Sequence, residues 1–168
     1  MPKRSRPLTV DDVAAIVALT GGATDRPSIY KAVEAIAAET CGFVFLTTLR
    51  SDETAGVVRR LHSSNEDAYP LAGTKPLSKI TKSSQTLAAG EVFLAGTREA
   101  VKEAFFDHEL IFSLGSSAIM NAPIRHAGRR LGTLNFCGEE GQYGPDEIAT
   151  AKVLAGLLIP CLLAEEAA

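Results

Sequence analysis

Residues Gly115–Cys137 read GSSAIMNAPIRHAGRRLGTLNFC and predict a β-hairpin. Its two strands are Ser117–Arg125 and Arg130–Cys137, both rich in residues that favour extended structure. The turn between them, HAGR, is short and polar, and its Gly128 can adopt a positive φ. We therefore take this hairpin as the starting point for the rest of the chain.

Side chains of the hairpin alternate between the two faces of the predicted sheet. One face is wholly apolar, which suits packing under helices: Ala118, Met120, Ala122, Ile124, Leu134 and Phe136. The other face mixes apolar and polar groups: Ser117, Ile119, Asn121, Pro123, Thr133, Asn135 and Cys137. A mixed face suits the wall of a small-molecule pocket, which is mostly apolar with a few placed polar groups. Asn121 and Asn135 are equally compatible with ordinary strand positions that face water.

The composition fits a single domain spanning residues 1–168. The chain has 168 residues, of which 46% are hydrophobic, and this is enough material for a core. A net charge of −3 argues against a nucleic-acid partner, because a nucleic-acid-binding surface normally carries a basic stripe. Only Lys3, Arg4 and Arg6 are locally basic, and we expect residues 1–7 to form a flexible, solvated tail.

Neither a membrane span nor a disulfide framework is evident. No apolar run reaches the roughly 18–20 residues that a bilayer requires. Asp11 and Asp12 interrupt the region where a signal peptide would be apolar. The three cysteines are too few, and odd in number, for a disulfide framework. We therefore expect a cytoplasmic protein that does not associate with a membrane.

Helical periodicity is strongest at the two ends of the chain. Thr9 and Asp12 resemble a capping box before a first helix, and Pro27 suits the first turn of a second. The final helix is predicted to start at Pro145, and Pro160 should bend or end it. Its apolar seam can pack on the sheet or on another copy of itself: Ile148, Ala151, Ala155, Leu158 and Leu162.

Strands and short helices are predicted between these ends. The expected strands are Phe43–Leu49, Val57–Ser63 and Glu91–Ala95. Ser64–Pro76 has little periodicity and is expected to form a loop, which in a compact domain is often functional. Helical structure is indicated by Leu77, Ile80, Ser84, Leu87 and Ala88, then from Thr97 through Phe105, and again at Leu110–Leu114. This order describes an antiparallel sheet with terminal helices on one face, an α+β domain.

The hairpin and its surroundings resemble a GAF domain, a small-molecule-binding and sensory fold related to PAS. The residues that carry the resemblance are the strand Ser117–Ile124 with its Ala-Pro-Ile ending, the strand Arg130–Asn135, and the helix that starts Pro-Asp-Glu at residue 145. Asp107–Gly115, with Tyr69-Pro70 upstream, is similar to a group of stand-alone bacterial GAF proteins. The resemblance covers Ala14 to Leu163.

The resemblance implies a six-stranded antiparallel sheet with the N- and C-terminal helices packed on one face. A ligand cavity would lie on the other face, roofed by Ser64–Ser116. It also implies a homodimer formed through the terminal helices, for which the seam on Ile148–Leu162 is available. These expectations agree with the two faces that alternation assigns to the hairpin.

The function that we expect is binding of an unidentified small molecule by a non-enzymatic, sensory GAF domain. Tyr69, Ser117, Asn121 and Asn135 would orient the ligand by hydrogen bonds. The remaining candidate ligand-binding residues are Ile119 and Phe106, which would enclose the ligand, and His108, which would reach it from the roof unless it only caps a helix. The sequence does not identify a cofactor.

An enzyme on the same fold is the alternative. Free methionine-(R)-sulfoxide reductase, a GAF enzyme, works by cavity cysteines in the roof segment. In this chain Cys41 ends a helix, Cys137 ends a strand and Cys161 lies on an apolar helix. That enzyme also has acidic substrate-binding residues in the hairpin, where this chain has Ile119, Asn135 and Cys137. An activity built on Cys137 or His108 remains open, as does a dimerisation module whose cavity is vestigial.

The sequence lacks the residue patterns that mark other known types of site. His62, His108 and His126 are scattered, without the paired spacing of a metal site. The cysteine of bilin-binding GAF domains and the Asn-Lys…Phe…Asp-Glu pattern of cyclic-nucleotide-binding ones are both missing. A Gly-rich phosphate loop and a Ser/His/Asp set are also missing.

Overall fold

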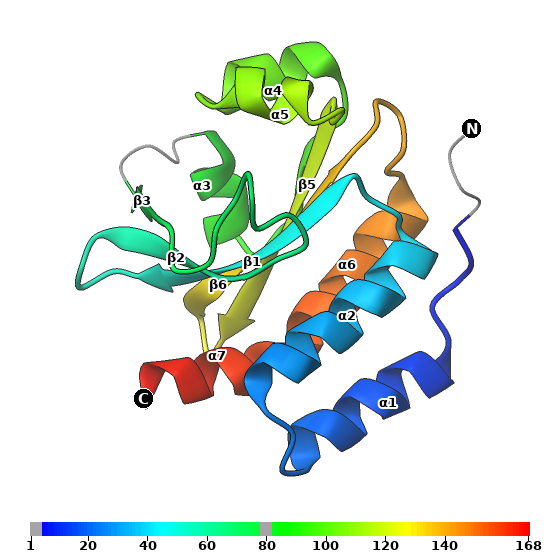
Figure 1. Ribbon diagram of the computed structural model, residues 1–168, viewed down its shortest axis with the longest axis vertical. Coiled ribbons are helices and arrows are strands. Elements are labelled where there is room, and N and C mark those ends of the chain that lie inside the picture. The colour runs from blue at the N-terminus through cyan, green and yellow to red at the C-terminus, as the bar shows by residue number, and fades with distance from the viewer. Residues whose placement is uncertain (1–4, 78–81) are drawn as a thin grey trace.

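A six-stranded antiparallel sheet forms the centre of the computed structural model, which describes residues 5–77 and 82–168 (Figure 1). The strand order is β3-β2-β1-β6-β5-β4. The strands are β1 (Phe45–Asp52), β2 (Val57–Ser63), β3 (Thr74–Pro76), β4 (Phe93–Ala95), β5 (Ala118–His126) and β6 (Arg129–Gly138). The predicted α+β class and six-stranded sheet are confirmed.

The predicted hairpin is the pair β5 and β6, whose ends lie within one residue of the expected bounds. Its turn contains Ala127 at φ 49° and Gly128 at φ 77°. Two central residues with positive φ are typical of a type I′ turn, whose twist matches that of the strands. Gly128 was expected to adopt this conformation, whereas Ala127 adopts it against its steric preference.

Alternation distributes the hairpin side chains over the two faces of the sheet as predicted. Met120, Leu134 and Phe136 are fully buried in the core under the terminal helices. Asn121 and Asn135 point to the opposite face, where they line a cavity. The sequence pattern therefore assigned the helix-covered face and the cavity face correctly.

A β-bulge breaks this alternation near the start of β6. The β5–β6 register shifts so that Leu131 has no partner strand residue, and Leu131 joins the core while Arg130 faces the cavity. A Cβ on the following Gly132 would overlap the carbonyl oxygen of Leu49 on β1. Glycine at this position allows β1 and β6 to approach each other closely.

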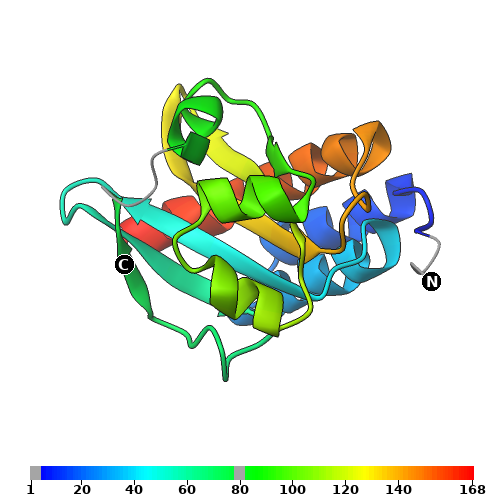
Figure 2. The ribbon, with the colours of Figure 1, turned by 90° about the horizontal axis from the view of Figure 1, so that it is seen from above.

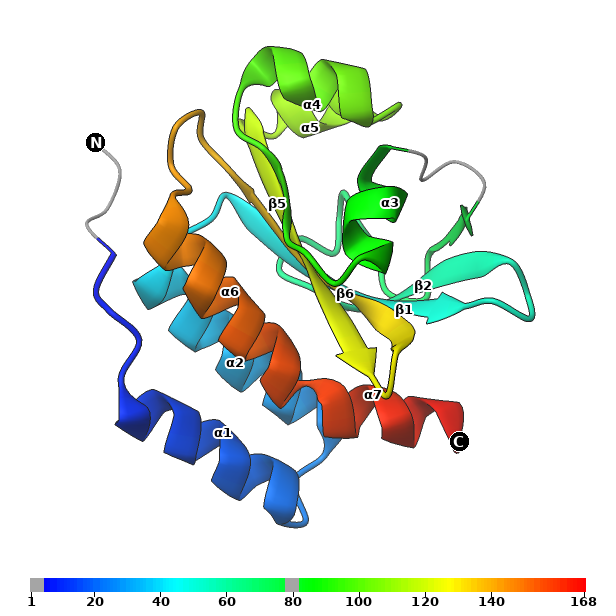
Figure 3. The same cartoon turned by 180° about the vertical axis from the view of Figure 1, so that it is seen from behind.

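The terminal helices cover one face of the sheet, as Figure 3 shows from behind. They are α1 (Val10–Gly21), α2 (Arg26–Thr40), α6 (Pro145–Leu157) and α7 (Ile159–Glu166). The predicted capping box forms at α1, because Thr9 Oγ1 accepts a hydrogen bond from the Asp12 amide and Asp12 accepts one from the Thr9 amide. Arg6, expected in a flexible tail, pairs with Asp12 and Glu39, whereas Lys3 and Arg4 lie outside the described residues.

The last helix ends near Pro160, as predicted, and the chain continues as α7 after a bend of 40°. Within the described ranges no single helix is long and apolar enough to cross a membrane; only α6 and α7 taken together pass by length and composition.

The apolar seam packs on the sheet, because Ala151, Ala155, Leu158 and Leu162 are fully buried in the core. Of the two alternatives for the seam, packing on the sheet is confirmed.

Three short helices lie over the other face of the sheet, as Figure 2 shows from above. They are α3 (Lys82–Ala88), α4 (Arg98–Ala104) and α5 (His108–Ser113). Thr97 caps α4 as predicted, and Val101 and Ile111 bury into a second, smaller core with Phe45. The expected loop Ser64–Pro76 ends in β3, an edge strand that its weak periodicity did not predict. Ile80, expected in a helix, lies outside the described residues.

Candidate functional site

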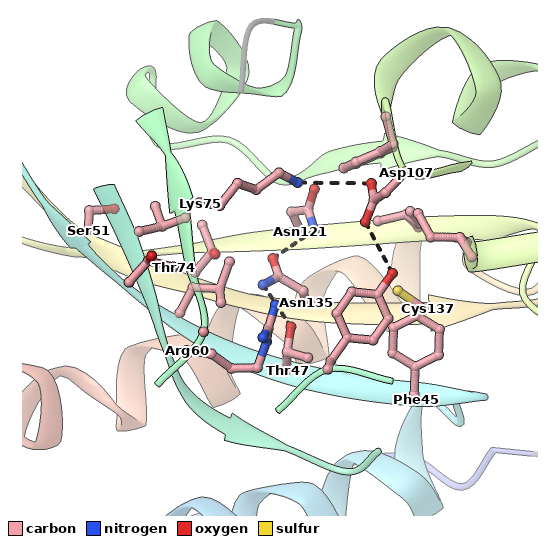
Figure 4. Close-up of a pocket in the computed structure, with 18 of the residues that line it drawn as sticks. Phe45, Thr47, Ser51, Arg60, Thr74, Lys75, Asp107, Asn121, Asn135 and Cys137 are labelled. Carbon is pink, nitrogen blue, oxygen red and sulfur yellow. Dashed lines mark hydrogen bonds and ion pairs between the residues drawn. The ribbon is translucent and has the colours of Figure 1, made fainter. Parts of the chain in front are cut away.

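A cavity of about 300 Å³ lies between the sheet and the segments that cover its free face (Figure 4). Side chains of β1, β2, β5 and β6 form its floor, and Tyr69, residues 73–75 and 105–107, Leu87 and Ile111 complete it. The volume is at the lower end of the range found for small-molecule sites. The free face of the sheet thus has the hollow that a ligand requires.

Aromatic side chains provide much of the apolar wall. The rings of Phe45 and Tyr69 stack with centroids 5.0 Å apart, and Phe105 packs against the same small core. Ile119, which is 2% exposed, contributes an aliphatic surface from β5. Phe106 also lines the cavity but is 59% exposed, and it therefore lies at the mouth. These surfaces suit a flat, apolar part of a ligand.

A chain of buried polar side chains crosses the floor. Asn121 Nδ2 donates to Asn135 Oδ1 at 2.7 Å, and Asn135 Nδ2 donates to Thr47 Oγ1 at 3.2 Å. The chain joins β5, β6 and β1, and each of the three side chains is at most 7% exposed. Asn121 Oδ1 accepts no hydrogen bond from the described residues. It is therefore available to a ligand donor.

Charged side chains enter the cavity from two sides. Arg60 on β2, Lys75 on β3 and Arg130 on β6 supply positive charge. Asp107, in the segment between α4 and α5, is the one carboxylate among the described lining residues. Lys75 Nζ lies 4.0 Å from Asp107 Oδ1, and the Arg60 guanidinium lies 5.1 Å from the Tyr69 ring centroid. The lining as a whole is positively charged.

Tyr69 connects two segments of the roof. Its hydroxyl donates to Asp107 Oδ2 at 3.1 Å, across 38 residues of sequence. Burial, together with the nearby Asp107 carboxylate, raises the pKa of the Tyr69 phenol, because both disfavour the phenolate. Tyr69 therefore remains a neutral donor and holds Asp107 in place beside the cavity.

Comparison of the fold with solved structures finds close matches at low sequence identity. The GAF domain of a phosphoenolpyruvate-protein phosphotransferase from Coxiella burnetii superposes with a TM-score of 0.74 at 14% identity, over 94% of each chain. The GAF domain of a sensor histidine kinase from Bacillus halodurans gives a TM-score of 0.70 at 14% identity, over 85% of this chain and 97% of that one. This chain has the GAF fold.

A third match is the chromophore-binding domain of the bacteriophytochrome RpBphP3 from R. palustris, with a TM-score of 0.69 at 14% identity. The match covers 94% of this chain but only 61% of the bacteriophytochrome domain. The amino-acid sequence itself matches neither a protein-family model nor a curated protein. The family resemblance of the hairpin is thus supported by the GAF fold and not by overall sequence similarity.

Five of the seven residues predicted to contact a ligand line the cavity of this GAF fold. They are Tyr69, Phe106, Ile119, Asn121 and Asn135. Their role in binding remains a prediction. Asn121 and Asn135 are not the ordinary water-facing strand residues of the alternative interpretation, because both are buried and joined to each other.

The other two predicted residues lie outside the cavity lining. His108 Nδ1 donates to the Phe105 carbonyl oxygen at 2.9 Å, and its ring faces Phe112 at 5.7 Å, so it serves the start of α5. Ser117 precedes β5, and its hydroxyl oxygen accepts a hydrogen bond from the Glu140 amide. Local hydrogen bonds of this kind are what short polar residues commonly make at the ends of helices and strands.

The sequence interpretation missed the charged lining residues Arg60, Lys75, Arg130 and Asp107. Arg60 shares its strand face with Val58, and this signal was readable from alternation. Lys75 lies on β3, which is too short for a periodic pattern. Asp107 was named only as the start of the stretch that resembles stand-alone GAF proteins.

The positions of the cysteines weigh against a thiol-based reductase. Cys137 lines the cavity but is 6% exposed, and burial raises the pKa of its thiol, which disfavours the reactive thiolate. Cys41 and Cys161 belong to the core under the terminal helices, on the opposite face of the sheet. Among the described residues, no second cysteine is placed to resolve a sulfenic acid formed on Cys137.

Metal binding has no support in the described part of the chain. No group of three or more His, Cys, Asp or Glu side chains is arranged to hold an ion there. His108, the histidine predicted to reach the cavity from the roof, lies outside its lining. The groups that this site offers are therefore amides, aromatic rings and charges.

Proposed function

We propose that this GAF-fold domain binds a small organic molecule in the cavity and acts in sensing. The observation that carries the proposal is the 300 Å³ hollow, in which apolar walls surround the polar chain Asn121–Asn135–Thr47. An apolar pocket with few, fixed polar groups is the usual form of a small-molecule site. Ligand occupancy would be relayed to a partner through the segments that cover the cavity.

Two of the structural neighbours support a sensory role. One belongs to a sensor histidine kinase and another is a chromophore-binding domain of a bacteriophytochrome. All three cysteines of this chain are free thiols, which suits the reducing cytoplasm, where we place this function. The proposal assigns no catalytic residue, since Cys137 is protonated and buried.

Methyl NMR with a fractionated metabolite extract tests the proposal. Ile111 and Ile119 report on the cavity, whereas Ile16 and Ile124 report on the core under the terminal helices. We expect at least one fraction to shift the Ile111 and Ile119 methyl signals saturably and to leave Ile16 and Ile124 unchanged. If no fraction moves the cavity signals, the proposed function is wrong.

A cavity-filling variant provides the control. Thr133 on β6 lines the cavity, and Thr133→Phe places a ring in it at a strand position that favours aromatic residues. We expect this variant to lose the ligand-induced shifts while its Ile16 and Ile124 signals stay at their wild-type positions. Shifts that persist in Thr133→Phe would place the binding site elsewhere.

We also propose that the protein is a homodimer formed through the terminal helices, with a different surface from the one expected. The seam on α6 and α7 is buried against the sheet. Helix α1, in contrast, buries only Ile16 and exposes Val10 (84%) and Val17 (53%). Val153 on the adjacent α6 is 42% exposed. A second copy related by two-fold symmetry can cover these valines with the same patch.

A further inference from the structure

Two unpaired polar atoms belong to residues of the same cavity. Among the residues that the structure describes, the buried side-chain atoms without a hydrogen-bond partner are Arg50 Nε, Arg60 Nε and Asp107 Oδ1. Arg60 and Asp107 both line the cavity, one as a donor and the other as an acceptor. Native proteins rarely leave buried polar atoms unpaired, since each loses its hydration. Arg60 and Asp107 thus place one unpaired donor and one unpaired acceptor in the wall of the cavity.

Both groups are held in place by neighbouring atoms. Arg60 Nη1 donates to the Pro70 carbonyl oxygen at 2.8 Å, and its guanidinium lies over the Tyr69 ring. Asp107 Oδ2 accepts the hydrogen bond from the Tyr69 hydroxyl. Figure 4 shows Arg60 and Asp107 reaching the cavity from opposite sides. Because these groups are preorganised, a ligand that pairs with them loses little free energy in ordering them.

The charge of the lining determines which group of the ligand meets which residue. Lys75 Nζ is within ion-pair distance of Asp107 Oδ1, but 4.0 Å is too long for a hydrogen bond, so this oxygen can still accept one. Arg60 has no ion pair among the described residues, and burial lowers the pKa of its guanidinium. An anion beside Arg60 would offset this burial. Arg130 adds further positive charge to the same lining.

We propose, on the basis of the small-molecule function above, that the ligand is an aromatic or alicyclic organic anion that also carries an N–H or O–H donor. Its acidic group pairs with Arg60, and its donor bonds to Asp107 Oδ1. Its ring lies against the stacked pair of Phe45 and Tyr69. Neutral apolar molecules and organic cations are disfavoured, since they leave the Arg60 charge unpaired.

A matched set of probes tests this assignment, with dissociation constants measured from the Ile119 methyl signal. The isomers of hydroxybenzoate carry both groups, the methoxybenzoates lack the donor, and the hydroxybenzamides lack the charge. We expect at least one hydroxybenzoate to bind about tenfold or more tightly than its methoxybenzoate and its hydroxybenzamide, because a hydrogen bond to a charged group is involved in each comparison.

Two variants with neighbouring controls connect each preference to its residue. Arg60→Gln should abolish the preference for hydroxybenzoate over hydroxybenzamide, and Arg59→Gln, on the adjacent exposed residue, should retain it. Asp107→Asn should reduce the preference for hydroxybenzoate over methoxybenzoate, and Glu109→Gln, exposed on α5, should retain it.

The outcomes separate this inference from the proposed function. If hydroxybenzamides bind as tightly as hydroxybenzoates, the anion assignment is wrong and the small-molecule site stands. If a metabolite fraction shifts the Ile119 methyl signal but no probe does, the anion assignment is again wrong and the small-molecule site stands. If neither the probes nor any fraction moves Ile119, both the ligand class and the proposed function fail.

Discussion

Asn121 and Asn135 are direct partners in the β5–β6 pair, and their side chains are joined inside the cavity floor. Asn135→Ala would remove two hydrogen bonds and leave Asn121 Nδ2 without an acceptor in a buried position. We expect the free energy of unfolding to fall by about 1–3 kcal/mol, which is the usual cost of an unsatisfied buried group. Urea denaturation measures this change.

Thr133→Ala is the control for Asn135→Ala. Thr133 lines the same cavity from the same strand, but its side chain makes no hydrogen bond among the described residues. We expect its free energy of unfolding to stay within about 0.5 kcal/mol of wild type. Equal losses in the two variants would mean that the Asn121–Asn135–Thr47 chain does not stabilise the cavity floor.

Individual residues also show where prediction from sequence succeeds and where it stops. Alternation along a regular hairpin was sufficient to place Ile119, Asn121 and Asn135 on the cavity face. On β2 alternation also puts Arg60 on the face of Val58, but the β1–β2 register shifts at Leu61 and a bulge exchanges the faces beyond it. A bulge has no distinctive sequence pattern here, so the position of His62 under helix α2 became visible only in the paired strands.

At the scale of elements, α1 is anchored by charge at its first turn. The Arg6 guanidinium and the capping-box bonds of Thr9 hold the pKa of Asp12 well below its usual range. A lowered carboxylate pKa contributes stability that is fully present above the unfolded-state pKa of about 3.9 and is lost as the pH falls further. The contribution of Asp12 should therefore disappear only in acid.

Asp12→Asn tests this pH dependence. We expect wild type to be more stable than Asp12→Asn by a constant margin between pH 7 and about pH 5, and the margin to shrink below about pH 4. Urea denaturation across this pH range measures the margin. Asp11→Asn removes a charge from the same turn, where Asp11 has no ion pair among the described residues, and should show a smaller margin. If the stability margin between wild type and Asp12→Asn grows in acid, the lowered pKa of Asp12 is refuted.

The elements that the sequence failed to predict are those that depend on distant partners. Strand β3 has only three residues, includes Pro76, and exists because its backbone pairs with β2. Tyr69 was a candidate from its place in a loop, but its bond to Asp107 spans 38 residues and has no local signal. The regular helices and the hairpin, in contrast, carry their own periodicity, caps and turn residues.

At the scale of the whole molecule, the exposed valines of α1 and α6 predict a dimer. Light scattering after gel filtration should give about twice the 17.7 kDa of one chain. Val17→Glu puts a charge into the proposed contact and should yield monomers, because an unpaired charge is costly to bury. A monomeric wild type at micromolar concentration would refute the dimer.

Leu110→Glu is the matched control for Val17→Glu. Leu110 is also an exposed apolar residue, at 41%, but it lies on α5, which covers the opposite face of the sheet (Figure 2). The same charge at this position should therefore leave the dimer intact. Dissociation of both variants would show that the contact is not confined to the terminal helices.

The cavity remains the feature on which the functional account rests, and native mass spectrometry of protein purified from cells examines it as a whole. After incubation with a metabolite extract, we expect the wild-type mass to exceed that of the polypeptide by one small molecule that denaturation releases. The Thr133→Phe variant should show no such excess. An equal excess in Thr133→Phe, or none in wild type, would show that the cavity is not a ligand site.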